Sequence, residues 1–395
     1  MPFCEVSRMD ERLEFVMLAS AQGANMRGLC RRFGISPTTG YKWLGRWRLG
    51  GPAGLAEGSR RPRVSPLRTE AATEAAVVSV RARHPAWGGR KIARRLKDLG
   101  HDPVPAPSTV TAILRRHGIE LGTFGGGEAP FTRFERGAPN ELWQMDFKGH
   151  VALVAGRLHP LTVLDDHSRF AVVVAACADE TTETVRRHLI AAFRRYGLPE
   201  AMITDNGSPW GDGPRSPFTP LGVWLIEQDI AIAHSRPYHP QTMGKDERFH
   251  RSLKAEALSG PALADLAAAE RALARWRRIY NHERPHEAIA LAVPASRYRP
   301  SRRDYIEAPA PFDYAPGDIV RRVQQGGRIS LFGHALRLPK AFRAKDVAFR
   351  PTTQDGFFHA FFRNTFIAAV DIRTADRITQ PVHYVPEHLS ILSPV

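Results

Sequence analysis

Three acidic residues, Asp146, Asp205 and Glu247, are placed where carboxylates could bind divalent metal ions. Singly, each has an ordinary explanation: Asp205 precedes Asn-Gly and could form a turn, and the other two could be surface charges. Together they suit two hard cations about 3.5–4 Å apart, which can activate a water or 3′-hydroxyl and stabilise the leaving oxygen of a phosphodiester. Three acids gathered without metal would raise one another's pKa, so a bound cation is the simplest reason to collect them.

Glu247 belongs to a helix that we expect to begin at about Lys245, because no Pro or Gly follows until position 260. Glu247, Arg251 and Lys254 are spaced i, i+4 and i+7, so they share one helical face. This pattern favours a division of function in which Glu247 binds metal and Arg251 and Lys254 hold the DNA backbone. The alternative is a solvated face with one ion pair. Asp246 points about 100° away on the helix, and we expect it at the solvent or in a capping role.

The stretch before this helix predicts an α/β core that positions the acids. Asp146 is the odd acid in an alternating strand pattern, and Asp205 lies at the tip of a short apolar strand. Between them the pattern predicts two further strands, of which the all-apolar one should be central, and an amphipathic helix. Asp165 and Asp166 end a strand, where a turn with Arg169 nearby is favoured over metal ligation. The expected strands cover 140–150, 159–169, 170–177 and 201–205, and the helix covers 181–196.

The charge of the chain points to a polyanionic partner. The formal net charge is +16, and no apolar run approaches the length of a membrane span. Residues 1–128 carry a net +10, 129–260 a net −1 and 261–395 a net +7. Three widely separated cysteines form neither a disulfide framework nor a zinc site. We therefore expect a cytoplasmic, nucleoid-associated protein whose basic flanks bind nucleic acid and which has no membrane partner.

The first flank, residues 1–58, has the pattern of a helix-turn-helix DNA-binding domain. A helix, a Gly-containing turn, Ser36 as N-cap and Pro37 at the first helical position precede the expected recognition helix. Tyr41, Leu44 and Trp43 or Trp47 should pack inward. Early residues of a recognition helix meet DNA, so the candidate contacts are Thr38, Thr39, Lys42 and Arg46. A basic linker, 59–68, adds Arg60, Arg61 and Arg63.

Residues 69–122 form a second expected helix-turn-helix or winged-helix-like DNA-binding domain. Its candidate DNA contacts are Arg90 and Lys91, and Ser108 and Thr109 at the start of a helix for which Ser108 is the expected N-cap. A linker at 123–135 leads to the catalytic core with its closing helices, 136–300. After a further linker at 301–311, short strands at regular spacing in 312–395 predict a small SH3-like β-barrel.

Four ordered stretches give the chain a resemblance to bacterial insertion-sequence DDE transposases, most similar to insertion sequence family 481, with a core like that of retroviral integrases. The stretches are Gln144–Lys148, Leu164–Phe170, Thr204–Ser208 and Arg236–His250. The resemblance implies a multidomain protein: N-terminal all-α helix-turn-helix modules, a central α/β ribonuclease-H-like core, and a C-terminal small β-barrel. One departure is the spacing, because Asp205 and Glu247 enclose 41 residues where many relatives have fewer. The extra length fits a turn-rich insertion containing Asp212.

The resemblance implies a DNA transposase that binds transposon ends and catalyses strand cleavage and strand transfer. Asp146, Asp205 and Glu247 would be both the catalytic residues and the ligands of two Mg²⁺ ions, with Mn²⁺ as a substitute. The expected partners are double-stranded DNA, both the terminal inverted repeats and the target, and further copies of the chain in a dimer or larger oligomer. The alternatives are a catalytically silent DNA-binding regulator derived from a transposase, and a ribonuclease-H-like nuclease that cuts without joining.

Overall fold

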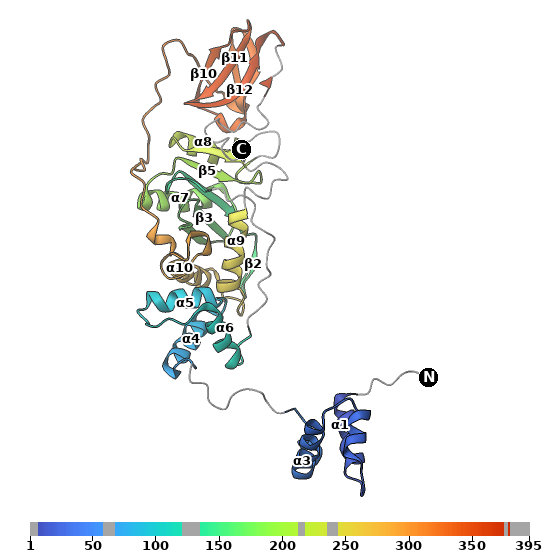
Figure 1. Cartoon of the computed structure of the whole chain (residues 1–395). Helices are drawn as coiled ribbons and strands as arrows, with labels where there is room; N and C mark the ends of the chain where they lie inside the picture. The colour runs from blue at the N-terminus through green and yellow to red at the C-terminus, as the bar shows by residue number, and fades with distance from the viewer. Residues whose placement is uncertain are drawn as a thin grey trace. The chain divides into compact units, whose positions relative to one another are not determined.

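The structure is a computed structural model (Figure 1), and it describes residues 7–57, 68–120, 135–211, 218–234, 244–374 and 378–379. The chain divides into two compact units, Met1–Arg68 and Thr69–Val395. Among the described residues, no helix is long and apolar enough to cross a membrane.

The first unit is a three-helix domain with a helix-turn-helix. As predicted, Ser36 is an N-cap whose side chain accepts a hydrogen bond from the Thr39 amide, and Pro37 is the first helical residue. The core gathers Phe15, Cys30 and Leu44. Tyr41 was expected to pack inward, but its exposed fraction is 61%, so this prediction is wrong. The helices are α1 (Arg8–Ala19), α2 (Met26–Arg32) and α3 (Pro37–Gly54).

The second unit begins with another three-helix module, which packs on the central domain. Its core is built around the fully buried Trp87, and Ile279 of the central domain packs against it. Arg95 donates a hydrogen bond to Glu283 Oε2 at 2.8 Å, with both side chains mostly buried. The module is therefore joined to the core by apolar packing and an ion pair. Its helices are α4 (Ala71–Arg83), α5 (Gly89–Asp98) and α6 (Pro107–Arg116).

The central domain is built on a mixed sheet of the order β2-β3-β1-β5-β6, with β4 paired to β3. β1 is antiparallel to β3 and parallel to β5, and β3 is antiparallel to β4, as the sequence predicts. The strands are β1 (Leu142–Phe147), β2 (Val151–Ala152), β3 (Arg157–Asp165), β4 (Ala171–Cys177), β5 (Ala201–Thr204) and β6 (Ala231–His234).

Helices cover both faces of this sheet (Figure 1). Alternate residues of a strand point to opposite faces: Val163 of β3 packs with α7 and α8, and Leu164 packs with α9 and α10. The helices are α7 (Thr182–Tyr196), α8 (Pro220–Glu227), α9 (Gly244–Leu253), the π-helical turn η3 (Lys254–Leu258) and α10 (Leu266–His282). Short 3₁₀ turns follow at η4 (Glu287–Ile289) and η5 (Pro294–Ser296).

Strand β4 was expected to be central because it is apolar throughout, but in the described sheet it pairs with β3 alone. Its open edge is covered by side chains of α10. Asn281 accepts a hydrogen bond from the Ala171 amide and donates one to the Ala171 carbonyl, and Glu270 accepts from the Ala176 amide. Because α10 covers this edge, an edge strand here can be as apolar in sequence as a central strand.

The C-terminal part has a five-stranded antiparallel sheet, β13-β12-β11-β10-β7, and a separate hairpin, β8-β9. The predicted small barrel is not confirmed, because the sheet is not closed among the described residues. Helix α8 joins this part to the central domain: Trp224 packs on the central core, whereas Val223 and Ile226 pack on the C-terminal core. The strands are β7 (Ile319–Arg322), β8 (Arg328–Leu331), β9 (His334–Arg337), β10 (Asp346–Pro351), β11 (Phe357–Phe362), β12 (Thr365–Asp371) and β13 (Ile378–Thr379). The turns are η6 (Gln325–Gly327), η7 (Lys340–Phe342) and η8 (Ile372–Thr374).

Candidate active site

The register of β1 and β5 brings two of the three predicted acids together. In this parallel pair Gln144 lies opposite Ile203, so two residues further along Asp146 lies at the level of Asp205. Neighbouring strands are about 4.8 Å apart. Asp146 pairs with Thr162 of β3, whose side chain contacts α9, so both acids belong to the face of the sheet that α9 covers.

The electrostatics of Asp146 agree with this proximity. Burial, and then the negative charge of Asp205, raise the pKa of Asp146 to about 7, while a hydrogen bond from the Phe147 amide opposes the rise. Asp205 accepts a hydrogen bond from the Gly207 amide at 2.9 Å. Paired carboxylates that repel each other form a donor set that a hard divalent cation stabilises. The two acids therefore fit one edge of a metal site.

A histidine of α9 supports Asp146 from the other side. Thr162 donates to the Asp146 carbonyl at 3.0 Å, so His250 Nε2, 2.8 Å from the same hydroxyl, must be the donor of the second hydrogen bond. Burial lowers the pKa of His250 to about 4, which leaves the ring neutral near pH 7. Its Nδ1 then faces Asp146 Oδ2 at 3.8 Å without a proton. The sequence pattern had not singled out His250.

Helix α9 places its acids differently from the prediction. Glu247 is exposed, and among the described residues no group of three His, Cys, Asp or Glu side chains could hold a metal ion. Asp246, expected at the solvent or in a capping role, is instead buried with an exposed fraction of 2%. Burial, and then the charges of Asp146 and Asp166, raise the pKa of Asp246. Its Oδ2 has no hydrogen-bond partner in the described part of the chain.

Asp165 and Asp166 are structural, in keeping with the interpretation that they form a turn. Asp165 accepts hydrogen bonds from the Ser168 side chain and from the Asn140 amide. Asp166 accepts from Gln144 Nε2 at 2.7 Å, from the Arg136 amide at 2.9 Å and from Lys245 Nζ. Lys245 is the second residue of α9, so Asp166 connects the turn after β3 to the helix that carries Glu247.

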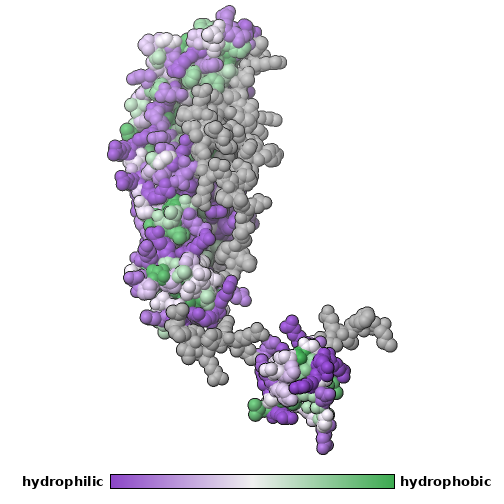
Figure 2. Space-filling view, viewed as in Figure 1, coloured by the Kyte–Doolittle hydropathy of each residue, from purple (hydrophilic) through white to green (hydrophobic). Residues whose placement is uncertain are grey.

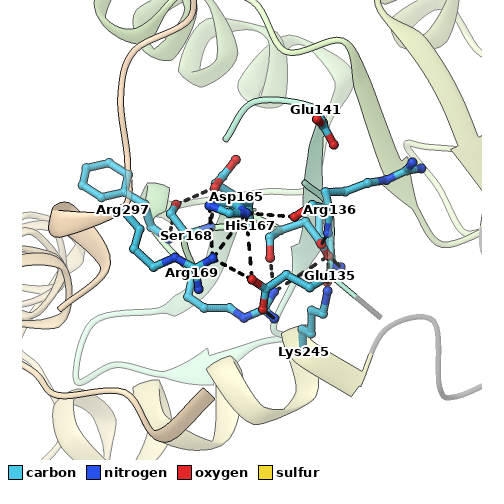
Figure 3. Close-up of polar contacts among 12 residues, drawn as sticks. Glu135, Arg136, Glu141, Asp165, His167, Ser168, Arg169, Lys245 and Arg297 are labelled. Atoms are coloured by element: carbon cyan, nitrogen blue, oxygen red, sulfur yellow. Dashed lines mark hydrogen bonds and ion pairs between the residues drawn. The ribbon is translucent and has the colours of Figure 1, made fainter. Parts of the chain in front are cut away.

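This polar network extends to the chain that leads into the core and the chain that leaves it (Figure 3). Arg169 and Arg297 both bind Glu135, at 3.1 and 2.7 Å. His167 Nδ1 donates a hydrogen bond to the Arg136 carbonyl at 2.8 Å. Sequence reasoning identified the turn, but not its ion pair with Lys245.

The predicted DNA contacts of the first unit differ in exposure and in their contacts, and Lys42 Nζ lies 5.4 Å from the centroid of the Trp43 ring. Thr38 and Lys42 are exposed at the start of α3. Thr39 bonds Ser36 at the N-cap, and Arg46 donates to the Ala56 carbonyl at 2.6 Å and lies over the Trp43 ring. Arg60, Arg61 and Arg63, like Asp212, lie outside the described residues.

In the second module Arg90 is exposed and Lys91 is half-buried at the start of α5. Ser108 is not an N-cap, because α6 begins at Pro107 with Ala106 in the capping position and without a side-chain cap. Ser108 is exposed and Thr109 is half-buried, and Arg251 and Lys254 are exposed on α9 and η3. The described residues on the face seen in Figure 2 are mainly hydrophilic.

Comparison with protein families accounts for each part of this arrangement. An integrase core domain matches residues 136–240, and a second integrase core domain family matches 228–294. A helix-turn-helix domain matches 11–63, a homeodomain-like domain matches 39–114, and the IS481 family transposase C-terminal domain matches 318–377. The chain therefore carries an integrase core domain together with a C-terminal domain of the kind found in IS481-family transposases. Its central mixed sheet is accordingly an integrase core of the ribonuclease-H-like type.

Among the curated proteins that the chain resembles are two insertion-element proteins. The "Insertion element IS407 uncharacterized 31.7 kDa protein" of Burkholderia multivorans is 31% identical over 176 residues, which are 45% of this chain and 61% of that protein. The "Insertion element IS476 uncharacterized 39.2 kDa protein" of Xanthomonas euvesicatoria is 32% identical over 157 residues, 40% of this chain and 44% of that protein. The chain thus spans about half the length of these curated relatives.

Among solved structures, the HTLV-2 integrase catalytic core domain in complex with magnesium is 17% identical, with a TM-score of 0.33. The match covers 40% of this chain and 97% of that one.

Proposed function

We propose that the chain is a DDE-type DNA transposase, which binds the terminal inverted repeats of its transposon and catalyses metal-dependent strand cleavage and strand transfer. The observation that supports this most is that Asp146 and Asp205 lie at the same level of adjacent parallel strands, on the face covered by α9. The integrase core domain match spans both aspartates. The repulsion between these two carboxylates supports a shared cation as their function.

In the proposed site Asp146, Asp205 and Glu247 hold two Mg²⁺ ions, for which Mn²⁺ can substitute. When bound, such ions lower the pKa of an attacking water or 3′-hydroxyl and neutralise charge on the scissile phosphate. The chain itself orients the ligands: Thr162 and the neutral His250 hold the end of β1 by the Asp146 carbonyl, and the Lys245–Asp166 ion pair holds the start of α9.

The same proposal assigns DNA binding to the flanking modules. The helix-turn-helix domains bind transposon ends, and Arg251 and Lys254 on the outer side of α9 and η3 contact the DNA backbone. Two ends must be joined to one target, so the active assembly is a dimer or larger oligomer. The working location is the nucleoid.

The experiment is a strand-transfer assay with the inverted repeats that flank the gene, in the presence of Mg²⁺. Asp205→Asn and Glu247→Gln should each slow cleavage and joining by at least about a thousandfold, because loss of a metal ligand removes several kcal/mol of transition-state stabilisation. Binding of the transposon ends should survive in both variants.

The matched control is Asp246→Asn, which removes the neighbouring buried carboxylate. Strand transfer should persist in this variant if Glu247 is the third ligand. If Asp205→Asn or Glu247→Gln retained strand transfer, the assignment of the acids would be wrong.

A second candidate, a catalytically silent DNA-binding regulator, is favoured by one observation: Glu247 is exposed and is not gathered with the two aspartates in a described metal-binding group. It predicts specific binding of the repeats without Mg²⁺-dependent cleavage. A ribonuclease-H-like nuclease predicts cutting without joining, so the same assay separates all three functions.

A further inference from the structure

A basic cavity lies between the second helical module and helix α9, within the second unit. Its volume is about 580 Å³, and its walls include the start of α5, one side of α9 and the chain after α10. We call it the α5–α9 cavity. The proposed chemistry does not use it, although the helix that carries Glu247 forms one wall.

The lining of the α5–α9 cavity is strongly unbalanced in charge. Its two carboxylates belong to Glu256 and Glu287. Its seven cations are Arg90, Lys91, Arg169, Lys245, Arg248, Arg251 and Arg284. A lining of this composition favours an anion.

Some of these cations already have carboxylate partners. Arg284 binds Glu256 at 2.8 Å, Arg169 binds Glu135, Lys245 binds Asp166, and Arg90 approaches Glu287 at 3.9 Å. Lys91, Arg248 and Arg251 have no ion pair with any carboxylate of the described residues. They come from two separate elements, α5 and α9, and line one space.

Lys91 is the most confined of these three cations. Burial, then the nearby Arg284, lower the pKa of Lys91 to about 8; Arg248 contributes in the same direction, and the carboxylates of Glu256 and Glu287 oppose the change. An unpaired ammonium group held among guanidinium groups is unfavourable without an anion. A phosphate between Lys91 and Arg248 would relieve this repulsion.

We propose that the α5–α9 cavity binds a phosphate of the DNA backbone, so that the second helical module and the catalytic helix hold the same stretch of DNA. This rests on the proposed function and adds the place of contact. Backbone phosphate is favoured over a free anion because one wall belongs to a homeodomain-like domain, matched at 39–114. Arg248 also adjoins Glu247 in sequence, so a phosphate held there is close to the proposed chemistry.

The test measures binding of a fluorescein-labelled DNA duplex, carrying the flanking repeat, to the full chain in EDTA over a range of KCl concentrations. Each lost phosphate contact lowers the salt slope by about 0.9, which corresponds to about eightfold weaker binding at ~0.1 M salt relative to a 1 M reference. Lys91→Met and Arg248→Ala should each show this loss, and Lys91→Arg should restore the slope.

The matched control is Lys97→Met, an exposed lysine on the same helix outside the cavity lining, which should leave affinity and slope unchanged. Equal slopes for Lys91→Met, Arg248→Ala and the parent chain would overturn the proposal. The binding assay does not measure cleavage, so the Asp205→Asn protein can replace the unmodified chain as the reference. A failure of the proposed catalysis is then distinguished from a failure of the proposed phosphate contact.

A second measurement does not depend on affinity. After reductive ¹³C-methylation, the NMR signal of Lys91, assigned with Lys91→Arg, reports its pKa. The duplex should raise this pKa by at least about one unit, since a phosphate favours the charged ammonium, whereas inorganic phosphate at the same phosphate concentration should have a smaller effect. An equal effect of inorganic phosphate would make this a free-anion site, and no effect of the duplex would exclude the contact; both overturn the proposal.

Discussion

Asp166 offers a sharp test of how the catalytic helix is held. The exposed fraction of its side chain is 1%. Its carboxylate accepts hydrogen bonds from Gln144 Nε2, the Arg136 amide and Lys245 Nζ. Asp166→Asn keeps the shape but has one acceptor oxygen and two N–H donors. At least one of the three groups that now donate to Asp166 would then face an N–H group instead of an acceptor. Lys245 would also lose its negatively charged partner.

The expected cost follows from these contacts. Removing one partner of a buried ion pair costs about 3–5 kcal/mol, and leaving one buried donor unsatisfied costs about 1–3 kcal/mol. Lys245 keeps 22% side-chain exposure, so water stabilises part of its charge. We therefore expect the free energy of opening the central sheet to fall by about 3 kcal/mol in Asp166→Asn.

Native-state amide hydrogen exchange is the appropriate assay, because a chain of several domains need not unfold in two states. Exchange of the β1 and β3 amides should accelerate by about two orders of magnitude, since 1.4 kcal/mol corresponds to a factor of ten. The control is Asp98→Asn, which removes the partly exposed Arg94–Asp98 pair and should cost less than about 1 kcal/mol. If both variants cost the same, Asp166 does not hold the site. A Lys245→Met variant and the double variant then measure the coupling of the pair directly.

Three further predictions concern other parts of the chain. Gly40→Ala should destabilise the first unit by about 1–3 kcal/mol in thermal unfolding, because the new methyl group would lie 2.6 Å from Cys30 Sγ. Asn281→Ala should cost about 1–3 kcal/mol and speed exchange of the Ala171 amide, whose acceptor it removes. The pKa of Lys91 falls from 10.5 to about 8 on folding, so between about pH 8 and pH 10.5 the unfolded chain binds more protons than the folded chain. The free energy of unfolding without DNA should therefore rise with pH across that window. Lys91→Met should flatten this rise in thermal unfolding measured at several pH values.

Much of the fold could be predicted from the sequence because local signals were strong. Ser36 and Pro37 began their helix as expected, and the strand pattern around Asp146 gave the correct mixed sheet. Errors arose where tertiary contacts decide. The apolar pattern of β4 indicates that both faces of the strand are buried, but it does not indicate how many strands lie beside it. At this edge of the sheet the burial comes from α10. Ser108 has the right residue type for an N-cap, but the capping position is Ala106, so the helix begins at Pro107, two residues earlier than a Ser108 cap implies.

The candidate site could be proposed from the types and order of its residues, but its geometry could not. A helical pattern establishes which side chains share a face, but not which face meets the sheet. In α9 the face formed by Asp246, Phe249, His250 and Leu253 is the one turned inward. Lys245–Asp166 and His250–Thr162 contacts fix that rotation, and neither is visible in the sequence because the partners are distant along the chain.

This rotation explains why one short helix can serve two purposes. The inward positions, at i, i+3, i+4 and i+7, anchor α9 against β1 and β3, so they tolerate little change. Glu247 and Arg251 then lie one position further round the helix and are exposed. Under the proposed function, an exposed Glu247 can bind metal beside a DNA backbone that approaches from outside, whereas an inward Glu247 would be closed to DNA. On that proposal, the rotation that buries Asp246 is what leaves its neighbour Glu247 open to substrate.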